Sequence, residues 1–348
     1  MEIMALKKCR VRFEDVVSIE GLLSAWEGFL RGKRRRKDVI EFGRNLMDHL
    51  FELHSDLING TYRHGGYHEF RVNDPKPRLI HKASVRDRIV HHAIFSALYP
   101  FYDSTFIADS YSSRVGKGTH RAINRLRACF RRSTRNFRRT AWVLKCDIRR
   151  YFASVDHAML MELLERRIGD RRIVLLLANI IGSFSMRPGK GIPLGNLTSQ
   201  LFANVYLNEL DQFVKQKLKD EYYIRYADDF VFVSADKASL LRMLDAINEF
   251  LRKRLDLTMH PDKVFLRVVS HGSDFLGWTQ FPHHRTQRKR VMRRARKAVF
   301  EATSLQVLAS YLGLLSHGNA HGFSEELVNL RGCNYLLDSL HWTSYEPL

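Results

Sequence analysis

Residues 221–234, EYYIRYADDFVFVS, place two adjacent acids between two runs of β-branched and aromatic residues. These runs predict two short apolar strands joined by a tight turn that carries Asp228 and Asp229. Neighbouring carboxylates repel each other and burial raises their pKa, so a divalent cation beside the turn would explain the pair. An ordinary hairpin turn with solvated acids remains the alternative explanation.

A third acid follows a short apolar run earlier in the chain. Residues 142–148, WVLKCDI, predict a strand that ends at Asp147. The expected order of strand, helices, acid hairpin, helix and strand corresponds to a βαββαβ sheet, in which the first strand ends beside the central hairpin. We therefore expect Asp147 and Asp228 to converge on two Mg²⁺ ions, with Mn²⁺ as a substitute. Such a pair of ions would activate a 3′-hydroxyl and stabilise a leaving pyrophosphate, which is nucleotidyl transfer.

The composition favours a nucleic-acid partner. The 348 residues, of which 45% are hydrophobic, are enough for two or three packed lobes. Lys and Arg number 57 against 37 Asp and Glu, which gives a formal net charge of +20. Such a charge attracts polyanions, and nucleic acid is the first candidate. A basic protein without this function is the alternative.

The four cysteines, Cys9, Cys129, Cys146 and Cys333, are scattered and form no CxxC pair. This spacing argues against a zinc ribbon or a disulfide framework and fits a reducing compartment. No stretch has the apolar length of a membrane helix, and the N-terminus lacks the features of a signal peptide. We expect a soluble, cytoplasmic protein that has no membrane partner.

Several basic segments are candidates for contact with phosphates, although runs of charge are often only solvated. Residues 31–37 form the run RGKRRRK, and residues 110–119 form a loop rich in Gly, Ser and Lys. The loop does not meet the spacing GxxxxGK[ST], so a P-loop NTPase is rejected. Further basic residues cluster near the start of the last seventy residues, which are expected to be helical. The predicted nucleic-acid-binding residues are Arg34, Arg35, Arg36, Arg114, Lys117, Arg288 and Arg293.

Two helix limits are also predicted. A helix that opens at Val85 is expected to stop before Pro100. The apolar positions after residue 200 predict another helix from Leu201 to Lys219, preceded by a flexible polar turn that contains Gly195.

Five segments occur in a fixed order along the chain. They are Pro75-Lys76-Pro77-Arg78, Arg86-Asp87-Arg88-Ile89-Val90, Asp147-Ile148-x-x-Tyr151-Phe152, Tyr226-Ala227-Asp228-Asp229 and Phe275-Leu276-Gly277-Trp278. Together they resemble the ordered motifs of reverse transcriptases. The resemblance spans roughly residues 60–320 and implies an α+β, right-hand polymerase fold with fingers, a ferredoxin-like palm and a helical thumb. The expected parts are an N-terminal helical extension (1–60), fingers (61–140), a palm with part of the fingers (141–280) and a thumb (281–348).

The resemblance implies roles for individual residues. Asp147, Asp228 and Asp229 would be catalytic, and Asp147, Ile148 and Asp228 would be the metal ligands. Phe152 would block a ribose 2′-hydroxyl, so that deoxynucleotides are polymerised. Arg78 would lie over the triphosphate, and Lys263 would assist the pyrophosphate leaving group. The nucleotide-binding residues would be Arg78, Phe152, Leu194, Gly195, Gln200 and Lys263, and the grip on the primer would be Phe275, Leu276, Gly277 and Trp278.

The segment from Leu194 to Gln200, LGNLTSQ, departs from the Gln-Gly and Ser-Pro of most retroviral and group II intron enzymes. Here it most resembles the reverse transcriptases of diversity-generating retroelements, which copy a template RNA with errors at adenines. The implied partners are template RNA, the cDNA/RNA duplex, deoxynucleotides and a small basic accessory protein that forms a ring, in a bacterial, archaeal or phage-encoded system. An antiphage defence enzyme is the first alternative. A group II intron protein and a non-catalytic RNA-binding protein are less expected, since the chain ends soon after the thumb and all three acids are present.

Overall fold

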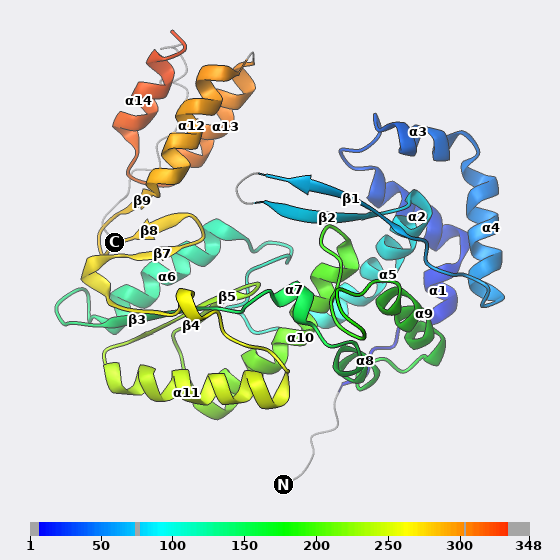
Figure 1. Ribbon diagram of the computed structural model, residues 1–348, viewed down its shortest axis with the longest axis horizontal. Coiled ribbons are helices and arrows are strands. Elements are labelled where there is room, and N and C mark those ends of the chain that lie inside the picture. Colours follow the sequence, from blue (N-terminus) through cyan, green and yellow to red (C-terminus); the bar gives the residue numbers. More distant parts are fainter. Residues whose placement is uncertain (1–6, 74–76, 303, 333–348) are drawn as a thin grey trace. The chain divides into compact units, whose positions relative to one another are not determined.

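A computed structural model describes residues 7–73, 77–302 and 304–332 (Figure 1). Cys333 and the predicted turn residues Pro75 and Lys76 therefore lie outside the described residues. The chain forms two compact units, and each is built from three separate stretches. Unit 1 comprises Met1–Ser113, Ile148–Lys219 and Asp245–Pro261, and unit 2 comprises Arg114–Asp147, Asp220–Leu244 and Asp262–Leu348.

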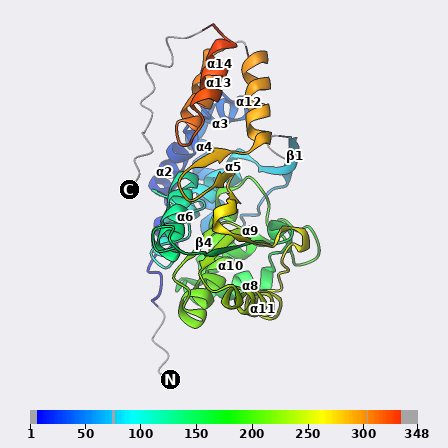
Figure 2. The ribbon, with the colours of Figure 1, turned by 90° about the vertical axis from the view of Figure 1, so that its left-hand side faces the viewer.

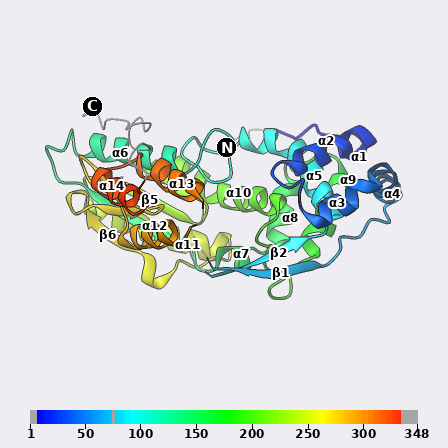
Figure 3. The ribbon, with the colours of Figure 1, turned by 90° about the horizontal axis from the view of Figure 1, so that it is seen from above.

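Unit 1 is mostly helical and carries one antiparallel hairpin. Helix α2 packs along α5, and α1 and α4 pack against α2 (Figure 3). Strands β1 and β2 form a two-stranded sheet that pairs Tyr67 with Ala83 and Val72 with Arg78. The elements are α1 (Phe13–Val17), α2 (Ile19–Leu30), α3 (Lys37–Arg44), α4 (Leu46–Ile58), β1 (Tyr67–Val72), β2 (Arg78–Ala83), α5 (Val85–Asp103), α7 (Tyr151–Ser154), α8 (His157–Glu165), α9 (Arg171–Gly182), α10 (Leu197–Gln212), a π-helix (Phe213–Leu218) and the last part of α11 (Lys237–Arg254).

Unit 2 contains a four-stranded antiparallel sheet in the order β4-β5-β3-β6 (Figure 1). Strands β3, β4, β5 and β6 are, in sequence order, the four strands of the predicted βαββαβ arrangement. The first strand, β3, lies beside the third, β5, and the second and fourth are at the edges. The ferredoxin-like palm is therefore confirmed. Helix α6 lies against β4 and β5. The elements are α6 (Thr119–Ser133), β3 (Trp142–Asp147), β4 (Tyr223–Tyr226), β5 (Asp229–Ser234), the first part of α11, β6 (Phe265–Val268), β7 (Ser273–Phe275), β8 (Trp278–Gln280), β9 (Arg285–Gln287), α12 (Lys289–Glu301), α13 (Leu305–Leu315) and α14 (His321–Asn329). One 3-10 turn lies at Pro261–Lys263, where the chain passes from unit 1 to unit 2, and another lies at Val269–His271.

The last three helices of unit 2 form a small bundle of their own. Figure 2 shows α12, α13 and α14 standing together. Each helix buries one apolar stripe, and Val299, Leu308 and Leu327 are wholly buried between them. The sequence predicted that the last seventy residues are helical. This prediction is wrong at the start of the region, because β9 precedes the bundle and pairs with β8.

Both predicted helix limits are wrong. Helix α5 runs through Pro100 to Asp103, because a proline in the last turn removes only a hydrogen bond near a helix end, where little helix remains to be disrupted. Helix α10 begins at Leu197, since Thr198 and Ser199 are buried in its first turn instead of lying in a polar loop. Its continuation, Phe213–Leu218, is a π-helix. None of the helices in the described part of the chain is long and apolar enough to cross a membrane.

Candidate active site

The register of the palm sheet brings the three predicted acids to one end of it. Asp147 is the last residue of β3 and stands opposite Asp229, the first residue of β5. On the other side of β5, Tyr226 of β4 pairs with Asp229, so Ala227 and Asp228 form the two-residue turn. Main-chain pairing therefore places the acids, as the sequence predicted.

The acid turn contains backbone strain and a buried support. Ala227 has a φ of +53°, a left-handed conformation that residues with a Cβ rarely adopt. Arg225 is completely buried in β4, and its Nη1 donates a hydrogen bond of 3.2 Å to the carbonyl of Ala227. The sequence analysis did not single out Arg225. A charged residue inside an otherwise apolar strand could have indicated its buried role.

Burial and the charges of neighbouring acids raise the pKa values of Asp228 and Asp229 above those of ordinary carboxyl groups. Burial raises the pKa of Asp228 to about 6, and the charges of Asp147 and Asp229 add to this effect. Burial also raises the pKa of Asp229, although the ammonium of Lys145 opposes the shift. A divalent cation would relieve both the repulsion and the desolvation of these groups.

Two lysines lie against the acids. Nζ of Lys263 is 2.8 Å from Oδ1 of Asp147, and Nζ of Lys145 is 3.2 Å from Oδ1 of Asp229. The sequence analysis assigned Lys263 to the leaving group and did not single out Lys145. In the chain as described, Lys263 pairs with a predicted metal ligand, and its role at the leaving group stays a prediction.

The donor set suits Mg²⁺. Among the described residues, no three His, Cys, Asp or Glu side chains form a ready-made metal cage. Mg²⁺ in phosphoryl-transfer sites is usually held by one or two carboxylates together with water and substrate phosphates, so a full protein cage is not required. Ile148 is buried and its apolar side chain has no ligating atom, so only its carbonyl oxygen could contribute.

The predicted nucleotide-binding residues, apart from Lys263, lie in unit 1. Phe152 is half-buried in α7 and its carbonyl accepts a 2.8 Å hydrogen bond from the N–H of Ile192. Gln200 is exposed in the first turn of α10, and Arg78 is exposed at the start of β2. The structure brings β2 and Leu194 together, because the N–H of His81 donates a 2.9 Å hydrogen bond to the carbonyl of Leu194.

Comparison with known proteins identifies the family. Residues 72–280, more than half of the chain, match the family described as Reverse transcriptase (RNA-dependent DNA polymerase). The chain belongs to the reverse transcriptase family. Members of this family polymerise DNA on an RNA template and normally use divalent metal ions.

Relatives and solved structures agree with this assignment. Protein YkfC of Escherichia coli is 30% identical over 280 residues, which cover 68% of this chain and 71% of that protein. The group II intron-encoded protein LtrA of Lactococcus lactis is 21% identical over 276 residues, covering 60% of this chain and 45% of LtrA. A telomerase from Candida tropicalis, solved in complex with a fragment of telomeric RNA, matches with a TM-score of 0.51 and 12% identity over 83% of this chain and 57% of that chain. This last likeness shows a shared fold, and the chain spans less than two thirds of LtrA and of the telomerase chain.

The predicted primer grip of this reverse transcriptase is a tight hairpin whose aromatic residues are core. Phe275 ends β7 and Trp278 begins β8, and each is 1% exposed. A Cβ on Gly318 would lie only 2.2 Å from the ring of Trp278, so this ring fills its space completely. Leu276 and Gly277, with φ of +50° and +89°, form the turn and are the part left accessible to a primer.

The predicted nucleic-acid-binding residues fall into two groups. Arg34, Arg35 and Arg36 are exposed between α2 and α3, and Arg293 is exposed on α12. The other three are partly buried and engaged. Arg114 and Lys117 have partners within the protein, and Nε of Arg288 lies 3.6 Å from Oδ2 of Asp274. The exposed group is the better candidate for contacts with phosphate.

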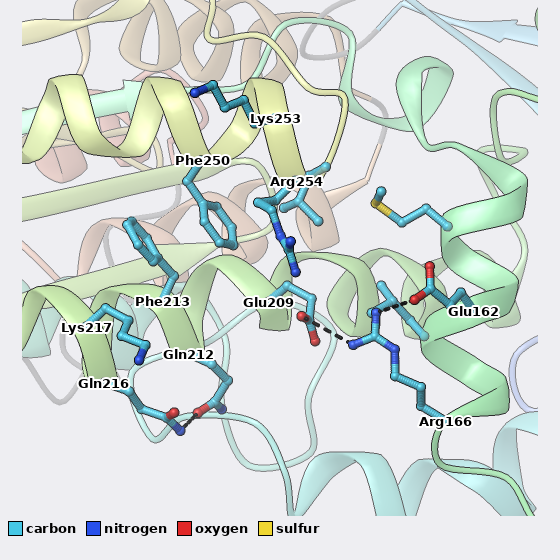
Figure 4. A pocket seen from close by; sticks show the side chains of 13 residues that line it. Glu162, Arg166, Glu209, Gln212, Phe213, Gln216, Lys217, Phe250, Lys253 and Arg254 are labelled. Carbon is cyan, nitrogen blue, oxygen red and sulfur yellow. Dashed lines mark hydrogen bonds and ion pairs between the residues drawn. The ribbon is translucent and has the colours of Figure 1, made fainter. Parts of the chain in front are cut away.

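Unit 1 also contains a pocket of about 380 Å³ between α8, the π-helix and the end of α11 (Figure 4). The rings of Phe213 and Phe250 stack with their centroids 4.3 Å apart. Arg166 lies 3.0 Å from Glu162 and 3.9 Å from Glu209. None of the predicted catalytic, nucleotide-binding or primer-grip residues lines this pocket.

Proposed function

We propose that this reverse transcriptase is an active polymerase that copies a template RNA into cDNA. The observation that carries the proposal is the register that sets Asp147 opposite Asp229 and leaves Asp228 on the turn between β4 and β5. A vestigial palm would not need to keep three mutually repelling acids together. Their unfavourable electrostatics are explained if the site works with bound cations.

Asp147 and Asp228, with the carbonyl oxygen of Ile148, would hold two Mg²⁺ ions, and Asp229 would act as the second acid of the turn. When bound, the ions supply activation of the primer 3′-hydroxyl and stabilisation of the leaving pyrophosphate. Lys263 would exchange its contact with Asp147 for the leaving phosphate and contribute positive charge there. Arg78 would bind triphosphate oxygens through its guanidinium, and Phe152 would exclude a 2′-hydroxyl.

The finer proposal is error-prone copying at template adenines, as in a diversity-generating retroelement. It is supported by the LGNLTSQ segment. Leu194 stands in it where most retroviral and group II intron enzymes have a glutamine. Leu194 can offer the incoming nucleotide only van der Waals contact, so discrimination between bases should weaken. The proposed partners are the template RNA, the cDNA/RNA duplex, deoxynucleotides and a small basic accessory protein, in the cytoplasm of the host.

Primer extension on an RNA template, followed by sequencing of the cDNA, tests both the polymerase activity and the proposed errors at template adenines. We expect extension with deoxynucleotides and substitutions concentrated opposite template adenines. Leu194→Gln should lower this misincorporation, whereas Leu194→Met, which changes shape but adds no amide, should keep it. Absence of extension would contradict the polymerase itself. Equal error spectra for wild type and Leu194→Gln would contradict only the role of Leu194.

A group II intron-type enzyme is the second candidate. It is favoured by LtrA and other intron proteins among the similar sequences, although the chain covers less than half of each of them. The same sequencing experiment separates the two proposals. Errors spread evenly over the four template bases would favour the intron-type enzyme, and errors concentrated at adenines would favour the diversity-generating type.

A further inference from the structure

The segment of residues 194–196 covers the outer edge of β2. The N–H of His81 donates a 2.9 Å hydrogen bond to the carbonyl of Leu194, and Nδ2 of Asn196 donates a 3.1 Å hydrogen bond to the carbonyl of His81. In an antiparallel pair the N–H and the C=O of one residue point to the same side of the strand. His81 therefore turns both groups away from β1, and the side chain of Asn196 takes the place of a main-chain donor on a third strand.

This edge contact is close, and its two hydrogen-bonding residues are buried. Asn196 is 2% exposed and His81 is 4% exposed. Gly195 lies between the two hydrogen bonds with a φ of +109°, and a Cβ there would come within 2.7 Å of Cγ2 of Ile80. Loss of the Asn196 amide would therefore remove the donor that the carbonyl of His81, a buried residue, has from this segment.

The contact matters because it supplies hydrogen bonds to the main chain of β2 along this edge. Strands β1 and β2 form a sheet of only two strands, and β1 is mostly exposed. Isolated hairpins of this kind are marginally stable in water. Arg78 begins β2 three residues before His81, so it lies about 10 Å further along the same strand. The position of its guanidinium relative to Leu194 therefore depends on the hydrogen bonds between β2 and the 194–196 segment.

A second anchor holds the start of α10, which follows this segment directly. Nδ1 of His91 on α5 lies 2.7 Å from the hydroxyl of Thr198, and Nε2 of His91 lies 3.1 Å from Nε2 of His64. Helix α5 follows β2 after a single residue, Ser84. The chain is thus tied to β2 at Asn196 and to α5 at Thr198, two residues later, which restricts Leu194 between β2 and α10.

We propose that Asn196 is a positioning residue: it fixes β2 against the 194–196 segment and thereby sets the affinity and base selectivity for the incoming deoxynucleotide. The inference rests on the proposed polymerase function. Asn196 acts through the main chain of His81 and through Arg78 and Leu194, and it is not assigned a contact with the nucleotide. Its loss should therefore change binding of the nucleotide more than the chemical step.

Asn196→Asp is the sharpest variant, because it keeps the shape of the side chain but replaces the donor with an acceptor. Asn196→Ala is the second variant in case the aspartate prevents folding, and Asn196→Ser, which restores a small donor, should recover part of the effect. Asn179→Ala is the matched control. Asn179 also bonds main chain in unit 1, donating 2.8 Å to the carbonyl of Tyr62 and accepting 3.1 Å from the N–H of His64.

Two measurements decide the proposal. In hydrogen exchange of the free protein, Asn196→Asp and Asn196→Ala should increase exchange in residues 78–83, and Asn179→Ala should not. In single-nucleotide incorporation, the Asn196 variants should raise KM for the deoxynucleotide about tenfold, with kcat changed less than about threefold, and should alter the misincorporation spectrum. The Asn179 variant should leave KM and the spectrum unchanged.

Unchanged exchange in β2 would overturn the coupling, and unchanged KM and error spectrum in folded Asn196 variants would overturn the positioning role. A fall in kcat alone would also contradict it, because that result would place Asn196 in the chemical step. A wild-type protein that extends no primer would contradict the proposed function instead. In that case the exchange measurement would still decide whether Asn196 holds β2.

Discussion

The sheet that carries the acids and the hairpin that carries Arg78 are both antiparallel, yet they are held in place differently. In unit 2, β3 lies between β5 and β6, and β5 lies between β4 and β3. At the acid end, Asp229 of β5 is paired on both edges, with Tyr226 and with Asp147. Four of the six residues of β5 are buried. In the described part of unit 1, β1 and β2 pair only with each other, and no residue of β1 is buried.

This difference separates two ways of building a site. The acids are placed by a ladder of main-chain hydrogen bonds that no single side chain controls. The hairpin is placed by separate contacts, among them those of the His81 main chain with Leu194 and Asn196. Lys82 also pairs with Asp38, and Tyr67 hydrogen-bonds Ser183. Substitutions in the acid turn should therefore change chemistry without moving the sheet, whereas substitutions beside β2 should change nucleotide binding by moving a strand.

The largest effect is expected for Asp228→Asn. The variant removes a predicted metal ligand, which is worth several kcal/mol of transition-state stabilisation, so primer extension should fall at least about 1,000-fold. The fold should survive, because the substitution also removes repulsion from Asp147 and Asp229. Extension assays and thermal unfolding without added metal check both parts. Asp236→Asn, in the exposed acid that follows β5, is the control and should keep full activity.

If Asp228→Asn unfolded the protein, the acid would be structural and the sheet would not be independent of it. If the variant kept more than about a tenth of the wild-type rate, Asp228 would not be a metal ligand.

Arg225→Met should be the most destabilising substitution near the acid turn. Methionine fills the apolar space of the side chain but cannot donate to the carbonyl of Ala227, which loses its buried partner. We expect the free energy of unfolding to fall by at least about 2 kcal/mol, measured by urea denaturation. Arg242→Met, at an arginine that is exposed on α11, should stay within about 0.5 kcal/mol of wild type. Equal losses for both variants would mean that the ladder alone holds the turn.

The sequence was informative about the strands of the palm sheet, where main-chain pairing decides the structure. The alternation around the acid turn and the run ending at Asp147 predict the strands and their order, and the motif resemblance adds the family. The sequence could not predict that Arg225 supports the turn, because this role depends on a buried hydrogen bond to the carbonyl of Ala227. It also could not predict the contact of Asn196 with His81, which joins residues 115 positions apart and has no local pattern.

Distant partners also decide features that the sequence analysis did not predict. Phe275 and Trp278 form part of a motif but are fixed by packing, and Gly318, which makes room for Trp278, lies 40 residues later in the chain. The polar side chains of Thr198 and Ser199 suggested a loop, yet both residues are buried by tertiary packing in the first turn of α10. Local propensity is overridden in each case by a partner that is distant in sequence.

Gly195→Ala tests the hairpin side of the comparison. A Cβ would be strained at a φ of +109° and would meet Ile80 at 2.7 Å, so β2 must shift away from the segment. We expect KM for the deoxynucleotide to rise about tenfold, which corresponds to about 1.4 kcal/mol. Gly189→Ala is the control, since its φ is also positive (+69°) but its Cβ would meet nothing within 4 Å. If both variants behaved alike in steady-state kinetics, backbone strain would explain the result and contact with β2 would not.

The smallest effect is expected for Ala227→Gly, which asks whether the acid turn is strained. Glycine adopts the observed φ of +53° without steric cost, so this gain should exceed the entropy that glycine loses on folding. The free energy of unfolding should rise by up to about 1 kcal/mol, while Ala246→Gly inside α11 should lower it by about 1 kcal/mol.

The same variant should reduce kcat a few-fold, because a glycine turn gives Asp228 more positions than the alanine turn allows. Greater stability together with slower extension would mean that the strain at Ala227 helps to aim the acid. Lower stability would mean that the ladder and Arg225 relieve the strain in the native state, so that β4 and β5 impose the turn at no cost. That outcome would extend the main-chain control seen at Asp147 and Asp229 to the turn residue itself.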